Sequence, residues 1–217
     1  MAGSPEGAAV DLWRGFPVQF RSAAERVLAA LPDAATPGQG SFSVQVEGEE
    51  LIIPRRIGNP EMGETKFAAL EGLVAACLYT RHHDGYVRQR NLERIVSSSL
   101  DFVVPYVVAL IGEYVVEIQE VIVEHLDLAT PGSPDCRRYG AFVRANPSYF
   151  EKTAQRVRSY WNCYYRHYGI TYAAGVGIDE PLPPSKQRYP GYLLIDQLRA
   201  AAADSYNPPT RVGGDRT

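Results

Sequence analysis

The sequence predicts a mainly α-helical protein, a single helical domain of about six to seven helices with one small β-hairpin near residues 42–57. Two observations lead to this prediction. From Glu64 onward, apolar residues recur three and four positions apart, which is the period of an amphipathic helix. Before that point, residues 41–57 alternate apolar and polar side chains on both sides of the sequence EGEE, as the two strands of a hairpin do.

Helices are expected over six segments. The one that begins at Asn146 has the clearest start, because asparagine can cap free N–H groups and Pro147 suits the first helical position. The six segments are residues 17–31, 64–81, 85–97, 102–126, 146–167 and 191–203, of which 102–126 is the longest. Residues 173–189 are rich in glycine and proline and are expected to form a loop.

The composition bears on domain organisation and location. Residues 1–10 and 205–217 are predicted to be disordered or loose, on either side of a single domain over residues 11–204. Three cysteines without close pairs argue against a disulfide framework and favour a cytoplasmic protein. The first residues lack a basic region followed by an apolar run, and glutamates interrupt the longest apolar stretch, so we expect neither a signal peptide nor a membrane span.

The segment RHHDGYVRQRNLERIV, residues 81–96, gathers unusual chemistry between two predicted helices. Arg88 shares its helix face with Leu92 and Ile95, so a buried guanidinium is expected there, and such a charge needs a carboxylate. Asp84 stands four residues earlier, near the start of the helix, where a carboxylate is favoured. The spacing therefore predicts an ion pair between Asp84 and Arg88.

His82 and His83 are candidates for catalysis in the same segment. Adjacent residues on a regular element point apart, and no HExxH or paired CxxC spacing accompanies them, so no metal site is expected. The alternative is that the two histidines cap carbonyl groups at the end of the preceding helix.

Four glutamates fall on one stripe of the predicted 102–126 helix, whose other positions are apolar. They are Glu113, Glu117, Glu120 and Glu124. One interpretation is an acidic groove that arginines from residues 81–94 meet, in which Glu113 and Glu117 would bind a partner or act as acid and base. The other interpretation is a stripe in contact with water.

The predicted 146–167 helix has a complete apolar face and a second line of residues beside it. Tyr149, Arg156 and Tyr160 lie on that second line, and aromatic residues with arginine commonly anchor interfaces. We therefore expect this line to bind a partner protein. Its basic residues, among them Arg158 and Arg166, leave nucleic acid as an alternative, although the net charge of −3 makes that partner unfavourable.

The sequence DGYVRQRNL resembles the first helix of a HEAT repeat at Asp84, Val87, Arg88 and Leu92 and departs from it at Asn91. The resemblance implies a pair of packed helices. The longer pattern LYTRHHDGYVRQR, GEYVVEI and SYWNCYYR resembles a family of uncharacterised bacterial proteins, a resemblance that brings no activity with it.

No phosphate-binding loop, nucleophile elbow or zinc-ligand set occurs in the sequence, so no cofactor is expected. The leading hypothesis is a non-enzymatic, cytoplasmic interaction or assembly subunit whose partner is another protein, with a homo-oligomer as a further option. The first alternative is a small enzyme that uses a buried cluster of arginine, glutamate and histidine. A nucleic-acid accessory factor is the second alternative.

Overall fold

The computed structural model describes residues 11–33, 40–62, 67–165 and 189–204. The described chain is mainly helical and carries one two-stranded antiparallel hairpin, which confirms the predicted fold class. Its α-helices are α1 Arg21–Ala30, α2 Ala69–Tyr79, α3 Gly85–Ile95, α4 Val104–Ile111, α5 Val116–His125, α6 Pro134–Ala145, α7 Pro147–Tyr160 and α9 Pro190–Ala203. The predicted disordered ends and most of the loop predicted over 173–189 lie outside the described residues.

Shorter helical turns connect these elements. Three are 3-10 helices, η1 Leu12–Gly15, η2 Val18–Phe20 and η3 Asp101–Val103, and a π-helical turn, η4 Trp161–Tyr165, follows α7 directly. Within the described residues, which reach Tyr165 here, the helix predicted over 146–167 corresponds to α7 followed by this turn. Among the described helices, none combines the length and the apolar composition that crossing a bilayer requires.

The hairpin pairs β1 Ser41–Val46 with β2 Glu49–Pro54 through a two-residue turn. Glu47 and Gly48 both have positive φ angles, 50° and 86°, and such turns match the twist of the two strands. Pro54 ends the second strand, since it has no N–H to donate to a ladder.

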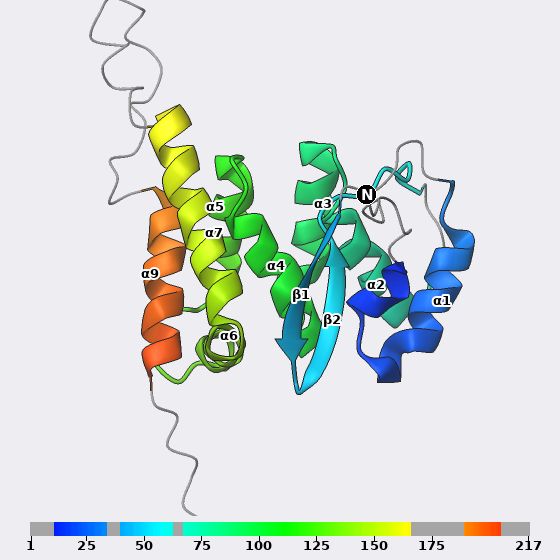
Figure 1. The fold of residues 1–217 in the computed structure, drawn as a ribbon, viewed down its shortest axis with the longest axis horizontal. Coiled ribbons are helices and arrows are strands. Elements are labelled where there is room, and N and C mark those ends of the chain that lie inside the picture. The colour runs from blue at the N-terminus through cyan, green and yellow to red at the C-terminus, as the bar shows by residue number, and fades with distance from the viewer. Residues whose placement is uncertain (1–10, 34–39, 63–66, 166–188, 205–217) are drawn as a thin grey trace, which may run out of the picture.

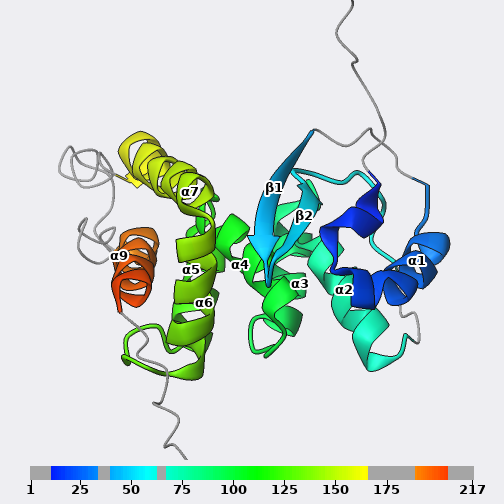
Figure 2. The same cartoon turned by 60° about the horizontal axis from the view of Figure 1, so that its bottom comes forward.

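Helix α4 lies in the middle of the molecule, with α1, α2, α3 and the hairpin on one side and α5, α6, α7 and α9 on the other (Figures 1 and 2). All eight residues of α4 are buried, as expected of a helix that is apolar all round. Buried apolar side chains from the hairpin and from each of these helices belong to one cluster.

The prediction of one long helix over residues 102–126 is wrong, because the helix is interrupted between Ile111 and Val116, and two helices, α4 and α5, form instead. The side chain of Gln119 stabilises this break. Its Nε2 donates to the carbonyl of Ile111 at 2.9 Å and to that of Glu113 at 3.0 Å, so two carbonyls that leave the helical pattern keep a partner. Gly112 ends α4, and a Cβ there would lie only 3.4 Å from atoms of α7.

Helix α6 was not among the predicted elements. Ser133 caps it by accepting a hydrogen bond from the Cys136 N–H at 3.0 Å, and Pro134 occupies its first turn. Gly140 lets α6 approach α9 closely, because a Cβ at this position would collide with the carbonyl oxygen of Ala201. The split of the long helix and this extra helix account for the difference from the six predicted segments.

Candidate functional site

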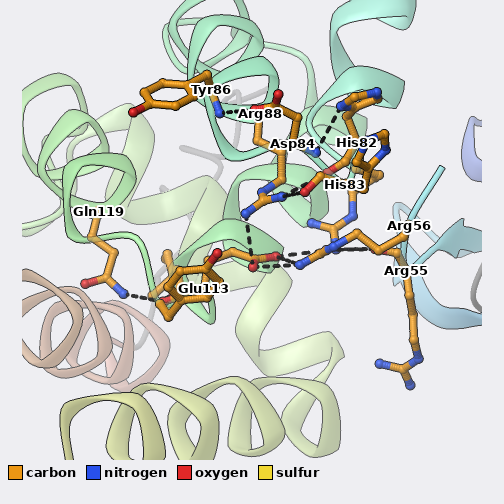
Figure 3. A network of polar contacts seen from close by, with 12 residues as sticks. Arg55, Arg56, His82, His83, Asp84, Tyr86, Arg88, Glu113 and Gln119 are labelled. Atoms are coloured by element: carbon orange, nitrogen blue, oxygen red, sulfur yellow. Dashed lines mark hydrogen bonds and ion pairs between the residues drawn. The ribbon is translucent and has the colours of Figure 1, made fainter. Parts of the chain in front are cut away.

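Three arginines from separate segments point their guanidinium groups at the carboxylate of Glu113. Arg56 Nη2 lies 2.8 Å and 2.7 Å from the two carboxylate oxygens of Glu113. Arg81 and Arg88 stand slightly further off, each with an Nη2 atom 3.8 Å from one of those oxygens. We call these four residues the arginine cluster. They join the end of β2, the corner between α2 and α3, and the break between α4 and α5 (Figure 3).

Most of this cluster is buried. The side chains of Arg81, Arg88 and Glu113 are 5%, 2% and 6% exposed, and that of Arg56 is 29% exposed. Burial lowers the pKa of Arg81 to about 10 against the opposing effect of Glu113, and it also lowers the pKa of Arg88. The carboxylate thus offsets only part of the cost of burying these cations.

The arginines also donate to backbone carbonyls. Arg81 Nη2 donates to the carbonyl of Arg55 at 2.8 Å, and Arg88 Nη1 donates to those of His82 and His83 at 2.9 Å and 2.8 Å. The Arg81 bond joins the end of the hairpin to the α2–α3 corner, and the Arg88 bonds join α3 to that corner. The cluster therefore has an evident role in holding the fold.

The predicted ion pair between Asp84 and Arg88 is wrong, because the carboxylate partner of Arg88 is Glu113. Asp84 instead caps α3, and its Oδ1 accepts a hydrogen bond from the Tyr86 N–H at 2.8 Å. This bond lowers the pKa of Asp84. The prediction of a buried Arg88 with a carboxylate partner was correct, but the partner comes from a distant part of the chain.

The two histidines differ in environment. His82 is buried, and its Nδ1 accepts a hydrogen bond from the Asp84 N–H at 3.1 Å, so it caps an N–H rather than the carbonyls that were expected. Burial lowers the pKa of His82, and the neighbouring His83 adds to this effect. His83 is exposed. Both side chains lie at the corner in Figure 3, and the carbonyls of both accept from Arg88.

The single stripe of glutamates does not exist, because Glu113 lies in the break before α5. The other three, Glu117, Glu120 and Glu124, are exposed on α5. Of the arginines expected to meet the row, Arg81 reaches Glu113, whereas Arg90 pairs with Glu61 at 2.5 Å. Glu113 and Glu117 therefore lie in different environments, one buried in the break and the other exposed on α5. Within the described ranges, no group of three or more histidine, cysteine, aspartate or glutamate side chains is arranged to hold a metal ion.

A second site lies immediately beside the first. Tyr114 follows Glu113 in the chain, yet its ring faces outward and contacts the rings of Tyr160 and Tyr164, both at centroid distances of 6.0 Å. The rings of Tyr160 and Tyr164 lie 6.2 Å apart. We call these three residues the tyrosine cluster. Tyr114 is 50% exposed and Tyr164 is 55% exposed, so the cluster forms an aromatic surface.

The predicted binding line on α7 is divided between two environments. Tyr160 belongs to the tyrosine cluster, but the ring of Tyr149 stacks on Phe42 of β1 at 4.9 Å and meets Phe142 edge-on. The expectation that Tyr149 is surplus to packing is therefore wrong. Arg156 is half-buried beside Gly112, between the two environments. Arg166, from the alternative of nucleic-acid binding, lies outside the described residues.

Sequence reasoning missed Arg56, Tyr114 and Tyr164. Arg56 stands two residues after Pro54, beyond the end of β2, and no local spacing links it to Glu113. Tyr114 was assigned to a continuous helix, so its outward position could be found only once the break was known.

A cavity of about 520 Å³ lies elsewhere, between the hairpin turn and α6. Val46, Val104 and Phe142 contribute apolar surface to it, and Glu47 lies at the turn. Its lining contains no member of either cluster. This cavity therefore does not bring together the residues that the sequence proposed for catalysis.

No protein-family model, curated protein sequence or solved structure matches this chain. The resemblances to a HEAT repeat and to a bacterial family consequently stay predictions, and the function must be argued from the two clusters themselves.

Proposed function

We propose that the protein is a non-enzymatic, cytoplasmic interaction or assembly subunit that binds another protein through its tyrosine cluster. The observation that carries this proposal is the meeting of three tyrosines from two separate segments on one exposed surface. Tyrosine suits such a role because its ring buries a large area and its hydroxyl stays hydrogen-bonded, at little entropic cost.

The contacts beneath this surface support the proposal. The Tyr165 hydroxyl donates to the carbonyl of Tyr114 at 2.7 Å, which ties the turn after α7 to the break before α5. Beneath it, the ring of Tyr165 contacts that of Tyr189 at 5.0 Å, and Tyr189 contacts Tyr192. An aromatic surface fixed on a packed aromatic layer loses little freedom when a partner binds.

The environment of the arginine cluster favours this proposal over a small enzyme. Nη1 of Arg88 and Nδ1 of His82 are engaged with the backbone, and Glu113 is buried whereas Glu117 is exposed on α5. Catalytic groups need access to substrate, whereas these groups hold segments of the chain together. A bacterial origin and a HEAT-like helix pair at α2 and α3 remain compatible expectations, with the pair serving as scaffold.

The test is site-specific photocrosslinking in cells of the native host. A photoreactive phenylalanine analogue replaces Tyr164 in one variant and Tyr86 in a matched control, which is another tyrosine with 78% exposure, on α3. We expect a discrete crosslinked species from position 164 that position 86 does not give, with a partner that mass spectrometry identifies.

The outcome depends on two further measurements. The Tyr114→Ser, Tyr164→Ser double variant should lose the partner in co-purification, while Tyr86→Ser keeps it. Sedimentation of the purified protein distinguishes a second copy of this chain from a different partner. Equal crosslinking at both positions, or a partner retained by the double variant, would refute the proposed surface.

A further inference from the structure

The cavity between the hairpin turn and α6 combines an apolar lining with charged groups of both signs. Its volume is about 520 Å³, which is in the range of cavities that bind small molecules. Val46, Val104 and Phe142 belong to the buried core of the protein and also line the cavity, and we call these three residues its floor. An apolar group that enters the cavity therefore leaves water for contact with the core.

One wall of the cavity is acidic. Glu47 of the hairpin turn and Asp101 of η3 both line the cavity, and we call them the acidic wall. No arginine or lysine of the described ranges forms an ion pair with either carboxylate. Partial desolvation raises the pKa of Glu47, and the charge of Asp101 adds to this rise. A cation at this wall would relieve the repulsion between the two acids.

The hairpin turn itself does not explain the glutamate at position 47. The φ angle of Glu47 is 50°, in the left-handed region where glycine and asparagine are favoured and a longer side chain is strained. Its carboxyl group lies within hydrogen-bond reach of Asp101, but two acids stabilise each other only when one of them is protonated. Strain of this kind is commonly found where a side chain serves a function.

Another wall of the cavity is basic and belongs to α6. Three arginines line it, of which Arg138 already has a carboxylate partner, Asp135 at 2.9 Å. Arg137 and Arg144, which we call the basic wall, are exposed and donate to backbone carbonyls. Neither has a carboxylate partner in the part of the chain that the structure describes. Each guanidinium carries five donors, so both retain donors for a ligand.

The acidic and basic walls line one cavity without pairing with each other, and the apolar floor is shared between them. A ligand that fits all three parts carries a cation and an anion at opposite ends of an apolar body. A peptide of two or three residues has this form, because its chain separates the terminal ammonium from the terminal carboxylate by about 3.3–3.6 Å per residue. A free amino acid holds both charges on one carbon, and an apolar acid or amine leaves one wall unpaired.

We infer that this cavity binds a short apolar peptide with free ends, whose ammonium group lies at the acidic wall, whose carboxylate lies at the basic wall and whose apolar side chain packs on the floor. Charge-assisted hydrogen bonds at both ends give the peptide one direction in the cavity. The lining contains no member of the tyrosine cluster, so peptide binding is independent of a protein partner there.

Titration calorimetry of the purified full chain tests the inference. The probes are the tripeptides Ala-Leu-Ala, Ala-Val-Ala and Ala-Phe-Ala, each with free ends, with an acetylated N-terminus and with an amidated C-terminus. We expect saturable binding of the free peptides and about tenfold weaker binding of either blocked form, since each has lost one charged end. No saturable binding of any free tripeptide would overturn the site. Equal affinities for free and blocked peptides would overturn the assignment of the ends.

Variants assign each end of the peptide to its wall. Glu47→Asn should weaken binding of the free peptide about tenfold and leave the N-acetylated peptide unaffected. The double substitution Arg137→Gln with Arg144→Gln should weaken the free peptide and leave the amidated one unaffected. Controls are Glu50→Gln on β2 and Arg158→Gln on α7, both at exposed positions that are not in the lining. Equal losses in the wall variants and in the controls would overturn the inference.

Thermal unfolding separates binding from a structural role of Glu47. Asparagine tolerates a positive φ better than glutamate does, and its side chain is uncharged beside Asp101. The Tm of Glu47→Asn without peptide should therefore match or exceed that of the parent, although the variant binds the free peptide more weakly. A lower Tm combined with unchanged peptide affinity would show that Glu47 serves the turn alone, and would overturn its assignment to the ammonium group.

Discussion

Glu113 and Tyr114 are neighbours in the chain, yet one belongs to a buried charged cluster and the other to an exposed aromatic cluster. The Glu113 side chain is 6% exposed and contacts three arginines, whereas Tyr114 is 50% exposed and contacts two other tyrosines. The charged side chain is therefore buried and the aromatic side chain exposed, the reverse of what their chemistry would suggest. The break between α4 and α5 causes this inversion, because successive residues outside a helix can point in opposite directions.

The comparison indicates which cluster the fold requires. Removing one partner of a buried ion pair leaves the other charge uncompensated, so the arginine cluster should be sensitive to single substitutions. The tyrosine cluster rests on an aromatic layer that is already packed, so its outermost rings contribute less to stability. Changes in the first cluster should therefore act on folding, and changes in the second on binding.

The largest effect is expected from Glu113→Gln, which removes the only carboxylate that the described chain supplies to Arg56, Arg81 and Arg88. The loss in free energy of unfolding should be about 3–5 kcal/mol. Urea denaturation measures it. The matched control is Glu117→Gln, a glutamate exposed on α5, whose change should stay within about 0.5 kcal/mol. Similar losses in both variants would mean that the arginines do not depend on Glu113.

Gln119→Ala should have the next largest effect, because it strips the donor from two carbonyls at the break. Leaving these acceptors buried without a partner should cost about 1–3 kcal/mol. Gln155→Ala, an exposed position on α7, serves as the control in the same denaturation experiment. If the two glutamine variants are equally stable, the side chain of Gln119 does not hold the break, and another cause must be sought.

Much of the fold could be predicted from the sequence, and the reasons are local. The hairpin alternates over two short strands around a glycine turn, and Pro147 lies in the first turn of α7. The expected cap by Asn146 is wrong, because its side chain hydrogen-bonds to the backbone of Gln45 instead. The break at residues 112–115 could not be predicted in the same way. Gly112 is a local helix-ending residue, but the apolar spacing resumes after it, and what stabilises the break is Gln119 and a set of arginines distant in sequence.

In the candidate site, too, the local features could be predicted from the sequence and the long-range contacts could not. The burial of Arg88 and its need for a carboxylate followed from the helical spacing, but helical spacing can propose only a partner on the same helix. Asp84 was the nearest choice, and it was wrong because the free N–H groups at the start of α3 compete for its carboxylate. Long-range pairing of Arg56 with Glu113 has no local signature, so only the structure could reveal it.

A smaller effect, with a distinctive pH dependence, is expected from Asp84→Ala. The hydrogen bond from the Tyr86 N–H lowers the pKa of Asp84 in the folded state. The cap therefore stabilises the protein above the ordinary pKa of aspartate, and this contribution is lost as the pH falls through the lowered pKa. Thermal unfolding should show a lower Tm for the variant at neutral pH and a smaller difference in acid. Asp84→Asn should keep most of the cap without that pH dependence. A difference between parent and Asp84→Ala that is constant with pH would contradict the cap.

The smallest effect on stability should come from the double substitution Tyr114→Ser with Tyr164→Ser. Both rings are at least half exposed, and the ring contacts that disappear are those of the outer layer. The loss in free energy of unfolding should stay below about 1 kcal/mol, because contacts between exposed rings return little beyond the area they bury. Circular dichroism and urea denaturation check this expectation, with Tyr86→Ser as the control for removing an exposed tyrosine. A variant that unfolds would show that the tyrosine cluster is part of the core and would remove the contrast with Glu113. A variant that stays folded and loses its partner would complete the contrast, since two adjacent residues would then serve folding and binding separately.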